Sequence, residues 1–195
     1  MIVGITGGIG SGKTTLCNRL RKDGYLVFDA DIVARNIQNN DSSIRKQLID
    51  LFGPESYTQD GLNRPFVASV VFNDTAMLEK LNAIVHPAVL VEFEKWIAEN
   101  SATSILFVES AILLKGKLRP LIDKIVIVIA SEETRIKRVC ERDGVNEDQV
   151  RNRISKQVTN AELLKQADFV IDTDIKQIHE LSIPVFIDYI KHLRK

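Results

Sequence analysis

The amino-acid sequence predicts an α/β fold in which helices cover a five-stranded parallel sheet. Short apolar runs alternate with amphipathic helical segments along the chain, the pattern of strand–helix–strand units. A glycine-rich turn separates the first apolar run from the first helical segment, and the 195-residue length suits one domain with insertions. The expected strands are Ile2 to Thr6, Leu26 to Asp29, Ser104 to Glu109, Lys124 to Ala130 and Asp168 to Asp172.

The glycine-rich turn is the most specific motif. In "GITGGIGSGKTT", Gly7, Gly12, Lys13 and Thr14 satisfy the pattern G-x-x-x-x-G-K-[ST]. Backbone N–H groups of such a loop surround a polyphosphate, while the lysine reaches the β and γ phosphates and the hydroxyl ligates Mg²⁺. The strand before it and the helix after it aim a helix dipole at the phosphates. The expected nucleotide-binding residues are Gly8, Gly10, Ser11, Gly12, Lys13, Thr14 and Thr15, with Thr14 as the Mg²⁺ ligand.

Two long segments interrupt the alternation. Residues 32–100 show helical patterns and no convincing strand, and residues 131–166 predict two helices, with Ser131 as a cap, Gly144 as a stop and Asn146 as a second start. Beside a phosphate loop, such insertions indicate a substrate domain and a lid. The predicted division is a nucleotide-binding core of residues 1–31, 101–130 and 167–195, an acceptor domain of residues 32–100 and a lid of residues 131–166.

Composition and charge limit the partners. Twenty-six basic residues balance twenty-six acidic ones, so no overall field favours nucleic acid or a membrane surface. The longest apolar run, Ile125 to Ala130, is too short to span a bilayer, and no basic leader precedes the first strand. We therefore expect a cytoplasmic protein. Cys17 and Cys140 lie on apolar helix stripes without metal-ligand spacing, so buried thiols are expected.

A pair of aspartates follows the second strand in "LVFDADIVAR". Asp29 and Asp31 come at its carboxyl end, the edge at which open α/β sheets bind ligands. Asp31 can accept the proton of an attacking hydroxyl, and Arg35, one helical turn later, can hold an anionic part of the acceptor. The alternative role of Asp31 is a helix N-cap worth about 1 kcal/mol. The two roles do not exclude each other.

Three arginines share one stripe of the first predicted lid helix. Arg135, Arg138 and Arg142 recur at helical spacing, apart from the apolar stripe. Guanidinium groups on a mobile helix pair suit neutralisation of a phosphoryl group. Arg138 and Arg142 are the expected phosphate contacts, and the role of Arg135 stays open. The alternative is a solvated basic face offset by neighbouring glutamates.

An ordered set of motifs resembles the dephospho-coenzyme A kinase family. After the phosphate loop come "FDADIVAR", "FG" at residues 52–53, "DGLNRPFVASVVF", "IVHPAV", "RVCERDG" and "ADFVIDTD". The resemblance covers nearly the whole chain. It implies a P-loop kinase that uses ATP and Mg²⁺ to phosphorylate the 3′-hydroxyl of dephospho-coenzyme A, the last step of coenzyme A biosynthesis.

The resemblance also suggests roles for individual residues. It makes Asp31 the candidate base and places coenzyme A binding in the helical insertion. With Lys13 of the phosphate loop and Arg142 of the predicted lid, Asp31 completes the set of catalytic candidates. Arg35, Arg64 and His86 become the candidate acceptor contacts. The His-Pro pair at His86 can alternatively only shape a helix junction, and Arg64 can be a solvated charge.

The chain departs from the family pattern at two places. After the third strand it has "ESAILLKGK", with Lys115 where the family has an acid, so Glu109 is the group left to support the Mg²⁺ water shell. "DTD" at residues 172–174 replaces an asparagine-containing turn near the expected adenine pocket. Recognition of the base through the backbone would survive that change.

Three other functions remain open at this point. A shikimate kinase or a nucleoside monophosphate kinase would share the phosphate loop, and the latter also shares the lid. The insertion of residues 32–100 is oversized for an acceptor as small as shikimate. A nucleotide-dependent switch is disfavoured because the sequence has no N-K-x-D guanine signature.

Overall fold

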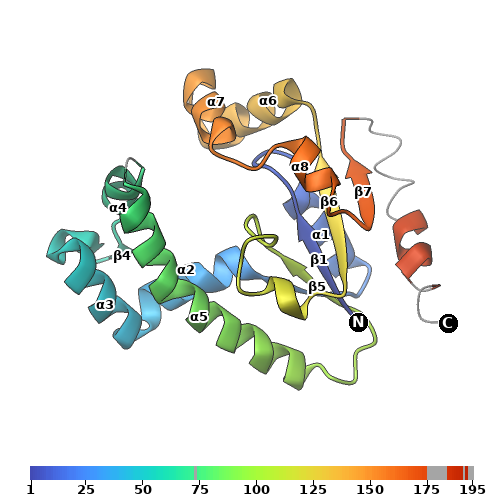
Figure 1. Cartoon of the computed structure of the whole chain (residues 1–195), viewed down its shortest axis with the longest axis horizontal. Coiled ribbons are helices and arrows are strands. Elements are labelled where there is room, and N and C mark those ends of the chain that lie inside the picture. Colours follow the sequence, from blue (N-terminus) through green and yellow to red (C-terminus); the bar gives the residue numbers. More distant parts are fainter. Residues whose placement is uncertain (73, 175–183, 191, 193–195) are drawn as a thin grey trace. The chain divides into compact units, whose positions relative to one another are not determined.

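The chain folds into two compact units. The computed structural model describes residues 1–72, 74–174, 184–190 and 192 (Figure 1). The first unit consists of residues 1–28, 103–115 and 119–195, and the second of residues 29–102 and 116–118. Residues 175–183, which belong to the predicted core segment 167–195, lie outside the described residues.

A parallel sheet of five strands forms the centre of the first unit, as the sequence predicted. Its strands lie in the order β2-β5-β1-β6-β7, and β1 pairs in parallel with both β5 and β6. The bounds are β1 (Ile2–Thr6), β2 (Leu26–Asp29), β5 (Leu106–Glu109), β6 (Lys124–Ile129) and β7 (Phe169–Asp172). Each strand begins and ends within two residues of its expected bounds.

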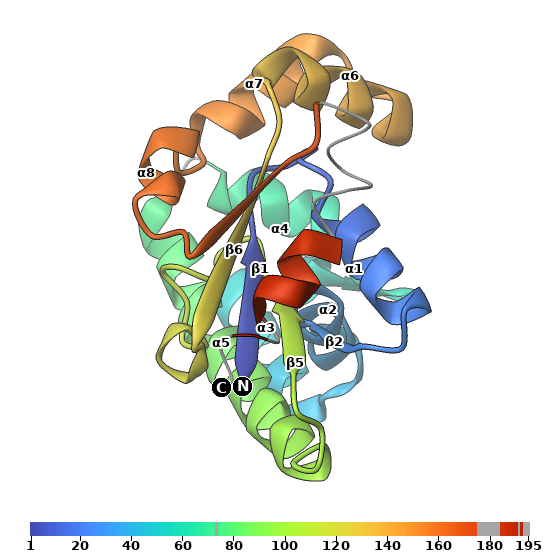
Figure 2. The same cartoon turned by 90° about the vertical axis from the view of Figure 1, so that its right-hand side faces the viewer.

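Helix α1 (Lys13–Lys22) and the helix of residues 184–190 lie on one face of this sheet (Figure 2). Alternate residues of β1, Val3 and Ile5, are fully buried there against Leu16 and Leu20 of α1 (Lys13–Lys22). Phe186, from the helix of residues 184–190, belongs to the same core cluster. Because this packing fixes α1 against the sheet, it also fixes the turn between β1 and α1.

The segment predicted as a lid contains three helices, not two. They are α6 (Glu132–Asp143), α7 (Glu147–Ser155) and α8 (Asn160–Leu164). Ser131 caps α6 by accepting from the Thr134 amide, and Gly144 ends it with φ 66°, both as predicted. Asn146 opens α7 with a capping box, also as predicted. Helix α8 was not predicted, because five residues are too few to show a helical period.

The second unit is helical, with one exception. Its helices are α2 (Ala30–Asn40), α3 (Ser42–Phe52), α4 (Arg64–Val71) and α5 (Thr75–Glu99), with a 3₁₀ turn η1 (Pro54–Ser56). The exception is an antiparallel hairpin of β3 (Tyr57–Thr58) and β4 (Gly61–Leu62), where no strand was expected. Strands of two residues show no alternation in a sequence. A second 3₁₀ turn, η2 (Arg119–Leu121), belongs to the first unit.

Both cysteines are free thiols. Cys17, a residue of α1, is fully buried in the core, as expected, whereas Cys140 is only half-buried. Cys140 packs against the small cluster of Ile136, Val139 and Val150 between α6 and α7. Within the described ranges, no helix has the length and apolar character needed to cross a membrane.

Candidate functional site

Glycine residues shape the loop between β1 and α1. Gly12, with φ 97°, is the residue before α1, and no side chain caps the helix. Gly7 lies so close to β6 that a Cβ there would be 2.1 Å from the Val128 carbonyl oxygen. The glycines therefore let the chain turn within the space beside the strand ends. The amides of the first turn of α1, at the positive end of the helix dipole, follow that loop directly.

The lysine of the motif folds back over the loop. Lys13 Nζ donates to the carbonyl oxygens of Gly7 at 2.8 Å and Gly8 at 3.0 Å. The ammonium group thus lies against the main chain that would surround a phosphate. A positive charge in this place, together with the helix N-terminus, makes the loop an anion-binding site.

A hydroxyl and a carboxylate lie beside each other at the ends of α1 and β5. Thr14 Oγ1 donates to Glu109 Oε1 at 3.0 Å, and Glu109 is only 4% exposed. Both groups offer the oxygen ligands that Mg²⁺ prefers. The described part of the chain has no group of three or more His, Cys, Asp or Glu side chains able to hold a metal. This donor set fits an ion that keeps waters and phosphate oxygens as its other ligands.

Arg138 of α6 reaches the loop through Thr173. Its Nη1 donates to Thr173 Oγ1 at 2.7 Å and to the Gly10 carbonyl at 3.3 Å, and its Nη2 donates to the Thr173 carbonyl at 2.9 Å. Thr173 Oγ1 in turn donates to the Ser11 carbonyl at 2.8 Å. Arg138 is therefore fixed beside the loop. Thr173 was not among the predicted residues, although it is the centre of the "DTD" turn that the sequence singled out.

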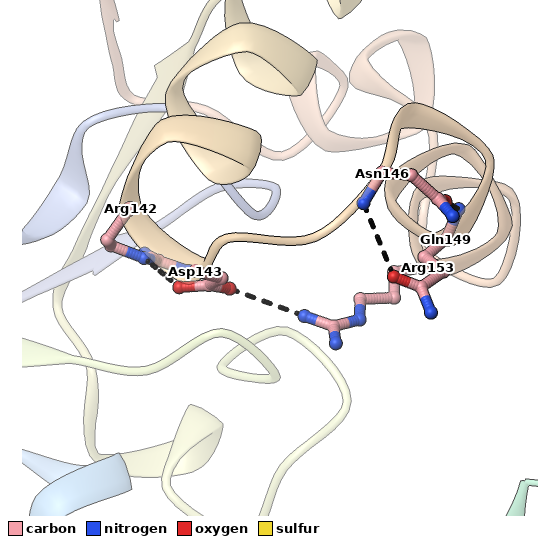
Figure 3. Close-up of polar contacts among 5 residues, drawn as sticks. All are labelled: Arg142, Asp143, Asn146, Gln149 and Arg153. Atoms are coloured by element: carbon pink, nitrogen blue, oxygen red, sulfur yellow. Dashed lines mark hydrogen bonds and ion pairs between the residues drawn. The ribbon is translucent and has the colours of Figure 1, made fainter.

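Arg142 is paired with its neighbour Asp143 at the end of α6 (Figure 3). Its Nε and Nη2 donate to the two carboxylate oxygens of Asp143 at 2.7 and 3.0 Å, and 62% of its side chain is exposed. Arg153 of α7 approaches the same carboxylate at 3.4 Å. These arginines, the hydrogen bond from Arg142 above all, lower the pKa of Asp143. In this structure Arg142 is bound by a carboxylate next to it in sequence.

Asp29, and not Asp31, caps helix α2. Asp29 Oδ1 accepts from the Ile32 amide at 2.9 Å, whereas Asp31 lies exposed in the first turn. The alternative that Asp31 is the N-cap is therefore wrong. The two acids take different roles because only a residue with extended backbone directly before the helix can turn its oxygen toward the third amide. The role predicted for Asp31 as a base does not compete with a capping bond.

Positive charge gathers in the second unit around a tyrosine. Arg64 Nη1 donates to Gln38 Oε1 at 2.9 Å, and the Tyr57 hydroxyl donates to the Gln38 carbonyl at 2.6 Å. The Arg45 guanidinium stacks on the Tyr57 ring at 4.5 Å from its centre. Burial, followed by the charge of Arg35, lowers the pKa of Arg64. The two predicted acceptor contacts, Arg35 and Arg64, are thus electrostatic neighbours, and their repulsion would be relieved by a bound anion.

Gln38, Tyr57 and Arg45 were missed because their contacts join segments far apart in the chain. The alternative that His86 and Pro87 only shape a helix junction is wrong, because α5 continues through His86 with Pro87 inside it. The half-buried imidazole has a lowered pKa, caused by burial first and by the nearby Lys117 second. His86 is therefore a mostly neutral side chain of the second unit at pH 7.

The structure brings part of the predicted site together. In the first unit, Lys13 and Arg138 both donate to carbonyls of the phosphate loop, and Thr14 donates to Glu109. The remaining predicted loop residues lie in the same turn or open α1: Gly8, Gly10, Ser11, Gly12 and Thr15. Arg142, in contrast, is bonded to the Asp143 carboxylate.

Solved structures share the fold of this protein. A structure described as dephospho-CoA kinase from Campylobacter jejuni has a TM-score of 0.69 at 21% identity, with 98% of each chain covered. Shikimate kinase from Acinetobacter baumannii in complex with shikimate has a TM-score of 0.57 at 14% identity, covering 100% of this chain and 95% of that one. The sheet, loop and helices are those of a P-loop kinase.

Sequence comparison identifies the family within that class. A dephospho-CoA kinase family model matches residues 1–179. A protein described as dephospho-CoA kinase from Salinibacter ruber is 39% identical over 175 residues, which is 88% of each chain. The chain belongs to the dephospho-CoA kinase family. It is accordingly an ATP-dependent phosphotransferase of coenzyme A biosynthesis.

Proposed function

We propose that this kinase transfers the γ-phosphoryl group of MgATP to the 3′-hydroxyl of dephospho-coenzyme A and releases coenzyme A and ADP. The observation that carries the donor half is the arrangement of Lys13, Thr14 and Glu109 at the phosphate loop. A lysine, a hydroxyl and a buried carboxylate at a helix N-terminus are the groups that phosphoryl transfer from a nucleotide requires.

On the donor side, the proposed Mg²⁺ site is made by Thr14 directly and by Glu109 through water. When bound, the ion would neutralise charge on the transferring phosphates. Lys13 would exchange its bonds to the carbonyls of Gly7 and Gly8 for phosphate oxygens. The amides of the loop and of the α1 N-terminus would hold the polyphosphate in place.

On the acceptor side, Asp31 is the proposed base. Its carboxylate would orient the attacking hydroxyl and take its proton as the oxygen bonds to phosphorus. Support comes from its position, two residues after the carboxyl end of β2, and from the finding that Asp29 makes the capping bond. The capping bond to the Ile32 amide therefore does not involve the Asp31 carboxylate.

The diphosphate of dephospho-coenzyme A suits the second unit's positive charges. We assign Arg35 and Arg64 to this anion because burial, followed by the charge of Arg35, lowers the pKa of Arg64, and a bound anion would offset both effects. His86 is proposed as a neutral contact to the acceptor. The second unit, whose range of residues 29–102 contains residues 32–100, is the proposed acceptor domain.

The segment of residues 131–166 is the proposed lid. Arg138 would remain beside the loop and contact phosphate, and Arg142 would leave Asp143 for the transferring group as the nucleotide binds. Arg153 already approaches Asp143 and can hold its carboxylate after the exchange. The expectation of a cytoplasmic location stays a prediction.

An assay of ADP release tests the acceptor. Purified protein with MgATP is offered dephospho-coenzyme A, shikimate, pantothenate or nucleoside monophosphates in separate reactions. We expect release above background only with dephospho-coenzyme A, and a product phosphorylated at the 3′ position by ³¹P NMR. Release with another acceptor and none with dephospho-coenzyme A would contradict the proposal and leave the fold intact.

A further inference from the structure

Arg135 of α6 is buried against the phosphate loop. Only 6% of the residue is exposed, although arginine is seldom buried without a partner. Its Nε donates to the Ile9 carbonyl oxygen at 2.9 Å, and its Nη2 donates to Gln157 Oε1 at 2.9 Å. The arginine whose role the sequence left open therefore makes contacts at the middle of the loop.

Gln157 completes a closed set of hydrogen bonds around one residue. The same oxygen, Gln157 Oε1, accepts from the Ile9 amide at 3.0 Å. Both main-chain groups of Ile9 are thus bonded to the lid segment, the carbonyl to Arg135 and the amide to Gln157. Arg135 lies in α6 and Gln157 between α7 and α8, so two separate parts of the lid segment hold the loop.

The glycines of the loop leave room for Arg135 as well as for a bound phosphate. A Cβ on Gly8 would lie 2.3 Å from Arg135 Nη2, and one on Gly10 would lie 2.6 Å from the Arg135 carbonyl oxygen. Gly8 does not have a positive φ, so its backbone conformation is open to other residues. A Cβ at position 8 would therefore displace the guanidinium group of Arg135 from its present place.

The charge of Arg135 has only neutral acceptors. Within the described part of the chain, no carboxylate lies within ion-pair distance of it, and the nearby Glu132 is bonded to Arg151 at 2.9 Å. Burial accordingly lowers the pKa of Arg135. A buried cation without a counter-ion is costly, and an anion bound in the adjacent loop would offset that cost.

We propose that Arg135 and Gln157 are positioning residues for nucleotide binding. They hold Ile9 so that the loop is formed before the nucleotide arrives, and Arg135 adds positive charge beside the polyphosphate. This clamp, meaning Arg135, Gln157 and Ile9, rests on the proposed ATP site. It goes beyond that site because it makes the lid segment part of the loop's own support.

Affinity for MgATP, measured by calorimetry at a temperature well below every melting transition, tests the clamp. Arg135→Met and Gln157→Leu should each weaken binding by about tenfold, the effect of losing hydrogen bonds that hold a preformed site. The double variant should bind about as weakly as the weaker single variant, because either change alone opens the clamp. KM for dephospho-coenzyme A should stay within about twofold of wild type.

Amide exchange of Ile9 gives a local readout that a general loss of stability does not reproduce. The Ile9 amide should exchange faster in Gln157→Leu, which removes the acceptor oxygen. It should stay protected in Gln157→Glu, which keeps an oxygen in that position. Arg151→Met is the matched control, since Arg151 is an exposed lid arginine bonded to Glu132 and Glu147. Its MgATP affinity should equal that of wild type.

Several outcomes would overturn the clamp. One is a lowered melting temperature with unchanged MgATP affinity in both single variants, which would make the contacts purely structural. Another is a strong effect of Arg135→Met with none of Gln157→Leu, which would make Arg135 a direct phosphate ligand. Because Gln157 is only half-buried, Gln157→Leu provides the test even if Arg135→Met does not fold. A wild-type protein that bound no MgATP would overturn the proposed nucleotide site and the clamp together.

Discussion

The two units concentrate positive charge by different means. In the first unit, Lys13, Arg135 and Arg138 are all bonded to main-chain carbonyls of the loop that they surround. In the second unit, Arg64 is bonded to a side-chain amide and Arg45 lies on an aromatic ring. One set of charges is fixed to the backbone, and the other is placed by side chains.

This difference matches the demands of the two substrates. A phosphoryl group in transfer must be held in one geometry, because misplacement of the reacting atoms slows the reaction steeply. The remote anion of an acceptor needs only to be bound. We therefore expect changes in the first unit to affect kcat and nucleotide affinity, and most changes in the second to affect KM for the acceptor. Asp31 is the expected exception.

The largest effect is expected for Asp31→Asn. The amide keeps the shape of the side chain and leaves the Asp29 cap in place but cannot accept the proton, so kcat should fall by about 10² to 10⁴. Single-turnover kinetics should show this fall, and a separate binding measurement should show an unchanged ATP affinity. Turnover near the wild-type rate would show that Asp31 is not the base.

The next largest effect is expected for Lys13→Ala. Removing a charge that serves the phosphates should lower kcat by about 10² to 10³ while folding is largely retained. The test compares activity with the melting temperature. Loss of most of the stability, with activity falling only in proportion, would mean that the bonds from Lys13 to Gly7 and Gly8 are structural.

An intermediate effect, on both kcat and ATP affinity, is expected for Arg142. Arg142→Ala should lower kcat roughly 10- to 100-fold and also weaken ATP binding, because the charge acts on the nucleotide in both states. Asp143→Asn should have the opposite effect on affinity, since it releases Arg142 from its present partner. Equal ATP affinity in all three proteins would show that Arg142 stays on Asp143.

A smaller effect, confined to the acceptor, is expected for Arg64→Ala. KM for dephospho-coenzyme A should rise about tenfold, with kcat and ATP affinity near wild type. Lys46→Ala, a change at an exposed residue of α3, is the matched control. A fall in kcat with constant KM would break the proposed difference between the two units.

The smallest expected effect is on the pH dependence of protein stability. Burial lowers the pKa of His86 in the folded protein, so near the ordinary value of about 6.5 the unfolded chain binds a proton that the folded chain does not. The stability contributed by neutral His86 is present above that pH and is lost as the pH falls through it. His86→Gln should therefore melt with a weaker dependence on pH between 8 and 5. Parallel curves for the two proteins would contradict the shift.

The local features of this chain were predictable and the distant contacts were not. The phosphate loop, the strands and the caps of α6 and α7 depend on residues within one turn of each other, so their patterns are visible in the sequence. The contact of Arg135 with Ile9 joins residues 126 positions apart, and no spacing rule indicates it.

The errors have equally specific causes. Asp29 and Asp31 both suit a helix start, and only the backbone conformation decides which one caps. Pro87 suggested a helix end, but α5 tolerates it and continues. The hairpin of β3 and β4 is too short to carry a pattern. In each case a short local signal was compatible with two structures, and packing selected one.

The position of β1 in the sheet has a consequence for biosynthesis. β1 is made first, yet both of its neighbours come much later, since Ile2 pairs with Leu106 and Val3 with Lys124. At roughly 5 to 20 residues per second, a ribosome needs on the order of ten seconds to supply them. Residues 29–102 of the compact second unit emerge in that interval. We expect the nascent chain to fold this helical unit before the sheet can close around its oldest strand.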